Sequence, residues 1–131
     1  MIKKITGLLL AAGYIILTPA CKEMKPNSPM EEAMKDSVFK VISEARYIRI
    51  EVKEHQDVTV TIGSERLFGG TEERRNEVIG QLEKMTVHYF EENNYLDEGK
   101  VIFVPNETTV PTEEDPKKEY DMNLKALLKK E

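Results

Sequence analysis

The thiol of Cys21 is the first group in this sequence whose chemistry follows from its position. It is the only cysteine among 131 residues, so it has no partner within the chain for a disulfide bond. A lone thiol must serve another purpose, and its neighbours in the sequence indicate which. Directly before it lies an N-terminal segment that changes from basic to apolar to small residues.

This N-terminal segment has the order of parts that an export signal needs. Lys3 and Lys4 give it a positive start, and residues 5–17 form a weakly polar to apolar run rich in Leu, Ile, Ala and Gly. Ala20 then supplies a small residue at the point where a peptidase would cut. The pattern predicts a signal peptide over residues 1–20.

With Cys21 directly after Ala20, the segment resembles the signal peptide of bacterial lipoproteins. In that class the cysteine is lipidated and becomes the first residue of the mature chain. The family usually has Leu three residues before the cysteine, where this chain has Thr18. The resemblance implies palmitate on Cys21, a lipidated tether over residues 21–28, and a place in the bacterial cell envelope, at the outer membrane if the source is Gram-negative.

Two other interpretations of the leader remain open. Thr18 and Ala20 also fit the small-x-small site of an ordinary signal peptidase, which would release a soluble protein. An uncleaved membrane anchor is the second, although a spanning helix needs about 20 apolar residues. The run that ends at Ala20 is shorter than that and contains Pro19.

The charge of the mature chain restricts its partners. Removing Lys3 and Lys4 from the 19 basic residues leaves 17 against 24 acidic ones, a net charge of about −7. Nucleic acid requires a basic face, so it is not an expected partner. Electrostatic docking on an anionic membrane is not expected either. Attachment to the membrane should therefore come from lipid on Cys21, since two or more acyl chains give stable anchoring.

Residues with the spacing of a catalytic or metal site do not stand out. His55 and His88 are the only histidines, and no cysteine or histidine cluster gives zinc a ligand set. The sequence also lacks a Gly-x-Ser-x-Gly elbow and a phosphate-binding Gly-x-x-x-x-Gly-Lys. We expect no metal, no cofactor and no enzyme activity. Catalysis stays open as an alternative, because triads assemble from distant residues.

The hydrophobic periodicity predicts one small α+β domain over residues 29–131 with the order α-β-β-α-β-α. Its two layers would be helices and a three-stranded mixed sheet. The first two strands should form an antiparallel hairpin, and the third should lie parallel to one of them after a right-handed crossover. The expected helices are 29–44, 72–92 and about 116–130, and the expected strands are 48–52, 58–62 and 101–104.

Local signals place the helix starts and the centre of the sheet. Ser28 and Glu31 have the spacing of a capping box around Pro29, and Thr71 can cap the second long helix. The compact run from Val101 to Val104 is typical of a strand that is buried on both faces.

The function expected from these features is binding by a non-catalytic envelope lipoprotein, with a protein or another envelope component as partner. One candidate surface is the polar face of the first hairpin, with Tyr47, Arg49, Thr59 and Thr61. The other is the loop with Leu67 and Phe68, although such a pair is more often a plug tucked into the core.

The alternative function is a small-ligand carrier or an accessory subunit of an enzyme. Such a protein needs a pocket of about 300 Å³ or more, for which we expect little room in so small a core.

Overall fold

The computed structural model describes residues 25–108 and 111–128. The predicted signal peptide, Cys21 and the first residues of the predicted tether lie outside the described residues.

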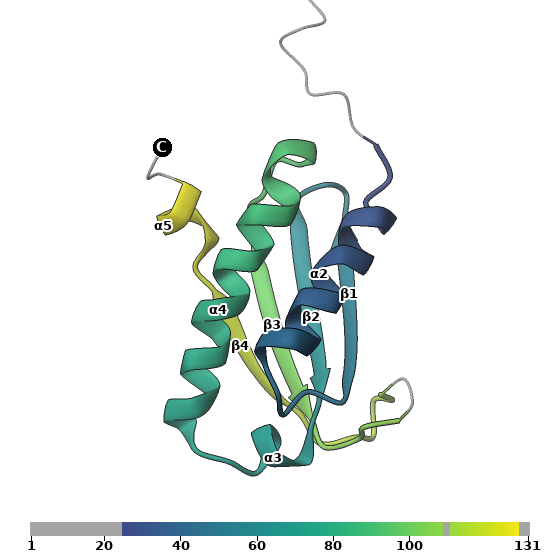
Figure 1. Ribbon diagram of the computed structural model, residues 1–131, viewed down its shortest axis with the longest axis vertical. Coiled ribbons are helices and arrows are strands. Elements are labelled where there is room, and N and C mark those ends of the chain that lie inside the picture. Colours follow the sequence, from purple (N-terminus) through teal and green to yellow (C-terminus); the bar gives the residue numbers. More distant parts are fainter. Residues whose placement is uncertain (1–24, 109–110, 129–131) are drawn as a thin grey trace, which may run out of the picture.

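The described residues form two layers, with helices covering one face of a sheet (Figure 1). Two long helices make up most of the helical layer, and both lie on the same side of the sheet. They are α2 (Ser28–Val41) and α4 (Glu72–Phe90). The strands are β1 (Tyr47–Lys53), β2 (Asp57–Gly63), β3 (Gly99–Val104) and β4 (Lys118–Met122). Shorter helical pieces are α3 (Glu65–Phe68), η2 (Glu91–Asn93) and α5 (Leu124–Leu128).

The sheet has the strand order β1-β2-β3-β4 and is mixed. The pairs β1–β2 and β3–β4 are antiparallel, whereas β2 and β3 at the centre are parallel. The predicted α+β class, the first hairpin and the parallel third strand are therefore confirmed. The predicted number of strands is wrong, because the described sheet has four strands and not three.

The fourth strand lies where we expected the start of the last helix. Residues 118–122 pair with β3, for example Tyr120 with Val101, and only residues 124–128 are helical. A predicted helix from about residue 116 is therefore wrong for this segment. Its hydrogen-bonding groups are satisfied by β3, which the sequence pattern of this segment alone does not reveal.

The first helix begins one residue earlier than expected and without the predicted capping box. Asn27 is the N-cap, and its side chain makes no capping bond, while Ser28 is already helical. The side chain of Asn27 is instead bonded to Asn93 and Asn94. By contrast, Thr71 caps α4 as predicted, because its hydroxyl accepts a hydrogen bond from the Arg74 amide at 3.0 Å.

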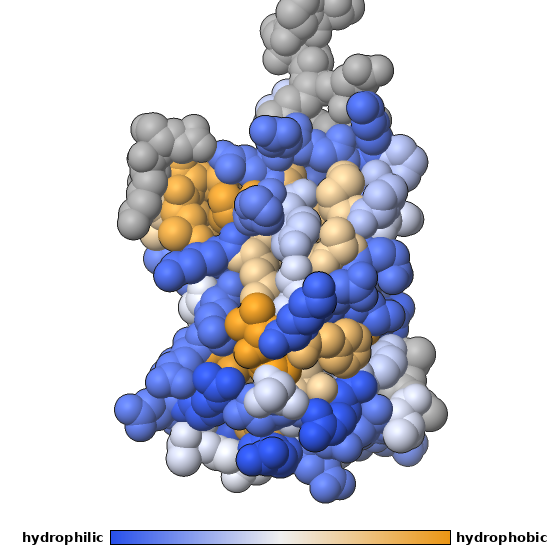
Figure 2. Space-filling view, in the orientation of Figure 1, coloured by the Kyte–Doolittle hydropathy of each residue, from blue (hydrophilic) through white to orange (hydrophobic). Residues whose placement is uncertain are grey.

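The core lies between the sheet and the two long helices. Side chains from β1, β2 and β3 alternate between this core and the other face of the sheet. In β3, Lys100 is exposed and Ile102 is half-buried, so the strand is not buried on both faces as predicted. Figure 2 shows the helical side as mostly hydrophilic, with apolar atoms in separate patches, one of them over α5. The largest fully buried side chains include Phe90, Phe103, Met34, Ile42 and Leu82.

Candidate functional site

The face of the sheet that points away from α2 and α4 is the first candidate site, and we call it the open face. The register aligns two rows of side chains across the four strands. One row is Arg49, Thr61, Ile102 and Glu119, and the next is Glu51, Thr59, Lys100 and Asp121. Within the described chain, no helix lies over these rows.

Most of the charge on the open face lies on the edge strands β1 and β4, and Lys100 on β3 is the one charged side chain of these two rows on a central strand. Thr59, Thr61 and Ile102 are half-buried β-branched side chains on the two central strands. On β1, Arg49 donates to Glu51 at 2.8 Å, and across the other edge Lys100 lies 3.5 Å from Glu119. All four charged side chains are more than 40 % exposed, so each pair adds little stability.

Four residues predicted as a binding surface come together on this face. Arg49 and Thr61 are direct neighbours in the register, and Thr59 lies two residues before Thr61 on the same strand. Tyr47 lies at the end of the face, opposite Gly63. A Cβ on Gly63 would lie 2.1 Å from the carbonyl oxygen of Asn106, so the glycine lets the β3–β4 loop cross this end of the sheet.

The other predicted pair, Leu67 and Phe68, does not join the open face. Leu67 is 1 % exposed and belongs to the core, so its side chain offers no surface to a partner. Phe68 packs partly buried against the same core, and the Lys118 ammonium lies 4.7 Å from its ring centre. Their places fit the plug interpretation.

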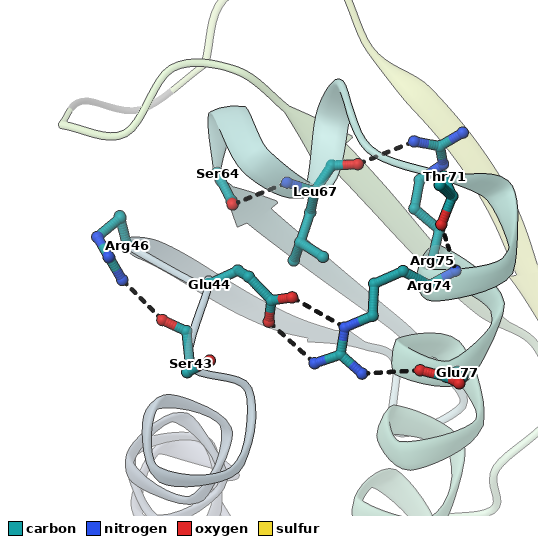
Figure 3. A network of polar contacts seen from close by, with 9 residues as sticks. All are labelled: Ser43, Glu44, Arg46, Ser64, Leu67, Thr71, Arg74, Arg75 and Glu77. Atoms are coloured by element: carbon teal, nitrogen blue, oxygen red, sulfur yellow. Dashed lines mark hydrogen bonds and ion pairs between the residues drawn. The ribbon is translucent and has the colours of Figure 1, made fainter.

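Arg75 holds the segment around this plug in place. Its side chain is almost fully buried, and its guanidinium donates to five oxygens, so the charge is satisfied by fixed partners. Figure 3 shows the bond to the Leu67 carbonyl. The acceptors are the carbonyls of Leu67 (2.9 Å), Phe68 (3.1 Å) and Gly70 (3.0 Å), the Glu72 carboxylate (3.0 Å) and the Tyr120 hydroxyl (2.9 Å). None of these residues lines either of the two surface hollows described below, and we interpret the cluster as a structural one.

Arg74 joins α4 to Glu44 in the loop between α2 and β1, through a bidentate ion pair that Figure 3 shows. Its Nε and Nη2 atoms each donate to the carboxylate of Glu44 at 2.9 Å, and Nη1 reaches Glu77 at 3.0 Å. The hydrogen bond from Arg74 lowers the pKa of Glu44, while partial burial acts in the opposite direction. Glu44 is therefore held as a carboxylate on a side chain that is only 16 % exposed.

A second polar cluster lies at the opposite end of the molecule, where α2 begins. We call its four side chains, Asn27, His55, Asn93 and Asn94, the asparagine clamp. Asn94 is 1 % exposed, and it donates to Phe90 O at 2.8 Å and to Asn27 Oδ1 at 2.9 Å. Its own Oδ1 accepts from Asn27 Nδ2 at 3.1 Å and lies 2.8 Å from His55 Nδ1.

Asn93 extends the clamp to the chain before α2. Its Oδ1 accepts from the backbone amide of Lys25 at 2.8 Å, and its Nδ2 donates to the Lys25 carbonyl at 2.7 Å. One side-chain amide thus pairs with both backbone groups of Lys25, as a neighbouring strand would. Nδ2 also lies 3.0 Å from Asn27 Oδ1. The predicted tether is therefore bonded to the domain from Lys25 onward.

The turn that carries His55 has an unusual backbone. Glu54 and His55 both have positive φ angles, 55° and 57°, and are the two central residues of the turn closed by the bond from Gln56 N to Lys53 O. Such turns favour Asn and Gly, and neither is present. The His55 carbonyl also accepts from the Tyr95 amide at 2.8 Å, which ties the turn to the chain after η2.

Sequence reasoning missed the asparagine clamp. Asn27 and Asn94 are 67 positions apart, and each taken alone resembles a turn residue. One signal was available. The turn between the first two strands contains no glycine, which indicates that a contact with another part of the chain supports its backbone. His88, the other histidine, makes an edge-to-face contact with Tyr89 at a centroid distance of 4.8 Å.

Two hollows on the surface are larger than the sequence led us to expect. One, of about 470 Å³, lies at the sheet end between Lys53, Asp97 and Lys125, and these last two form a 3.1 Å ion pair. The other, of about 540 Å³, lies beside the clamp and is lined mainly by Pro26, Pro29, Met30 and Tyr89. Both are open to solvent, so neither is an enclosed cavity.

Among residues 25–108 and 111–128, no three or more His, Cys, Asp or Glu side chains are grouped so that they could hold a metal ion. Over the same residues, no helix has the length and apolar character needed to cross a membrane.

No protein-family model, no curated protein and no solved structure matches this chain.

Proposed function

We propose that this chain is a non-catalytic lipoprotein of the bacterial cell envelope, anchored by lipid on Cys21. We propose further that it binds a protein or another envelope component through the open face. The observation that carries the proposal is the arrangement of the open face, with a weakly charged centre inside a charged margin. Specific interfaces have this anatomy, because the centre loses its water and the rim stays solvated.

Three features support the open face over other surfaces. It is built on rigid strands, so Thr59, Thr61 and Ile102 are held in fixed positions before any partner arrives. Four of the five charged side chains in the two rows, all except Asp121, are in ion pairs within the face, so these four need not be desolvated alone. The β3–β4 loop crosses one end of the face and limits it at Gly63.

Lipid anchoring is supported by the lone thiol at the end of a leader-like segment. The test is acyl labelling in cells with the Cys21→Ser variant as the control. Wild-type protein should carry the label and sediment with membranes, and Cys21→Ser should lose both properties. A soluble, cleaved wild-type protein with a free thiol would contradict lipid anchoring.

Binding through the open face is tested by site-specific photo-cross-linking in intact cells. A cross-linking residue at Thr59, Thr61 or Ile102 should give one discrete adduct. The matched control is the same cross-linking residue at the exposed helical positions Lys40 and Lys84, where it should give no discrete adduct. Thr61→Arg in the same chain should then remove the adduct formed from Thr59. Equal adducts from strands and helices would show that the open face is not the binding surface.

The second candidate is a small-ligand carrier or an enzyme accessory subunit. The 540 Å³ hollow beside the clamp favours it, because its lining of Pro26, Pro29, Met30 and Tyr89 is largely apolar. A carrier should bind an apolar fluorescent probe saturably, and Met30→Asp should abolish that binding while leaving the open-face adducts unchanged. Probe binding that is weak and insensitive to Met30→Asp would count against a carrier.

A further inference from the structure

The asparagine clamp fixes the direction in which the chain leaves the domain. Asn93 pairs with both backbone groups of Lys25, and Asn27 is bonded to Asn93 and Asn94. The clamp joins α2, the β1–β2 turn and η2, which lie far apart in sequence. We call this end of the molecule, where α2 begins in Figure 1, the clamp pole.

Cys21 lies only four positions before Lys25. An extended chain spans at most about 3.6 Å per residue, so four residues reach no further than about 14 Å. A flexible linker would let a domain take any orientation on a membrane, but a link this short to a fixed point does not. A lipid on Cys21 would therefore keep Lys25 within about 14 Å of the bilayer surface.

We propose that the clamp pole is a membrane-facing surface that rests against the headgroups of the bilayer. The proposal rests on the lipid anchoring proposed above. The long axis of the domain then stands away from the membrane, and the open face is turned sideways toward partners in the plane of the membrane. The opposite pole, with α3 and the start of α4, is the part furthest from the lipid (Figure 1).

The side chains at the clamp pole suit contact with a headgroup layer. Tyr95 is 49 % exposed, and its amide is bonded to the turn that carries His55. Tyrosine is favoured at membrane interfaces because its ring is apolar and its hydroxyl is polar. Pro26 and Met30 line the apolar hollow beside the clamp. Glu54 and Glu92 are exposed at this pole together with Lys25 and Lys53, so the pole carries both signs of charge, as a zwitterionic headgroup layer does.

The test compares two exposed glutamates at opposite poles. Glu92 lies just after α4 and Glu73 lies in its first turn, so they are about 28 Å apart along the helix axis. With Cys21 acylated, Glu92→Cys or Glu73→Cys supplies the only free thiol for a bimane label. Each lipidated protein is placed on phosphatidylcholine vesicles that contain a lipid with a spin-labelled headgroup.

Bimane at position 92 should lose most of its fluorescence to the spin label, and bimane at position 73 should lose little. Equal quenching at both positions, or stronger quenching at 73, in protein shown to be acylated would overturn the orientation and leave lipid anchoring intact. Protein that carries no acyl label and does not bind the vesicles would overturn the anchoring, and the orientation with it.

A second measurement isolates the clamp. Asn93→Ala removes both bonds to Lys25 and should reduce the difference in quenching between positions 92 and 73, because the short link is no longer fixed to the pole. Asn76→Ala, at an exposed asparagine in α4 far from the clamp, is the control and should leave the difference unchanged. Circular dichroism confirms that each variant is folded. An unchanged difference in the Asn93→Ala protein would show that the clamp does not set the orientation.

Discussion

Asn94 uses every hydrogen-bonding position of its side chain while almost fully buried. Both amide hydrogens are donated, to Phe90 O and Asn27 Oδ1, and its Oδ1 faces Asn27 Nδ2 and His55 Nδ1. Because Oδ1 only accepts, the Nδ1 atom of His55 carries the proton in this arrangement. A buried network with all groups satisfied specifies one geometry, and the loss of one partner leaves a polar group unsatisfied.

The ion pair between Glu44 and Arg74 predicts a dependence of stability on pH. Because the pKa of Glu44 is lowered in the folded protein, its contribution is present above the ordinary value near 4.5 and is lost as pH falls through the folded pKa. Glu44→Gln should lower the free energy of unfolding by about 0.5–1 kcal/mol at pH 7. In urea denaturation, this difference between wild type and variant should shrink below pH ~4.5.

Glu77→Gln is the matched comparison, since Glu77 bonds the same Arg74 but is 61 % exposed. Its effect at pH 7 should be smaller than that of Glu44→Gln. A loss of unfolding free energy in Glu44→Gln that stays constant from pH 7 to pH 3 would show that the Glu44 carboxylate is not the source of the pH dependence.

The part of the open face that depends on the alternation of polar and apolar residues along a strand was predictable from the sequence. Arg49, Thr59 and Thr61 alternate with apolar residues, so their common face follows from the period of a strand. The sequence could not show that Ile102 and Glu119 belong to the same face. Their place there depends on the pairing of β3 with the first hairpin and of β4 with β3. Pairings between distant segments leave no local pattern.

At the scale of elements, the β1–β2 turn stores strain that can be relieved. Glu54 occupies a left-handed conformation that Asn tolerates much better. We expect Glu54→Asn to raise the free energy of unfolding by about 0.5–1 kcal/mol, measured by urea denaturation. Gln56→Asn, at an exposed position next to the turn without a positive φ angle, should bring no such gain. A loss of stability in Glu54→Asn would show that the glutamate side chain is needed at this turn.

Strand β4 shows why one element was misassigned. Its sequence, Lys118 to Met122, has one basic and two acidic residues and low strand propensity overall apart from Tyr120. Tyr120, Leu124 and Leu128 are spaced by four, which imitates one face of a helix. Pairing with β3 and the bond from Arg75 to the Tyr120 hydroxyl override this local pattern.

The central position of β3 predicts the distribution of protection in hydrogen exchange. Strand β3 is hydrogen-bonded on both sides, to β2 and to β4, whereas β1 and β4 are the edge strands of the sheet. Amides of Val101 and Phe103 should exchange more slowly than those of β4, because edge strands open at lower free energy. Faster exchange in β3 than in β1 or β4 would contradict the strand order.

At the scale of the whole molecule, the clamp makes the residues before α2 part of the folded domain. A chain that starts at Ser28 should lose about 1–3 kcal/mol of stability, because Asn94 keeps its burial and loses both bonds to Asn27. A chain that starts at Lys22 should fold on its own with the full stability. The measurement is urea denaturation of both.

A chain that starts at Lys25 is the control, since it keeps every bond to the clamp side chains. It should match the chain that starts at Lys22. Equal stability of the chains that start at Ser28 and Lys22 would show that the bonds to Asn27 and Lys25 contribute nothing to the fold.

The parallel pairing of β2 and β3 sets the order in which the chain can fold. The β1–β2 hairpin closes over three residues, Glu54 to Gln56, whereas β2 must wait for the whole segment from Ser64 to Glu98 before it can pair with β3. Closing the longer loop costs about 2 kcal/mol more in chain entropy. The rate-limiting step of folding should therefore be the docking of α4 and β3 onto a preformed hairpin. Destabilising variants in β1 alone should mainly slow folding, because the hairpin is already formed at that step.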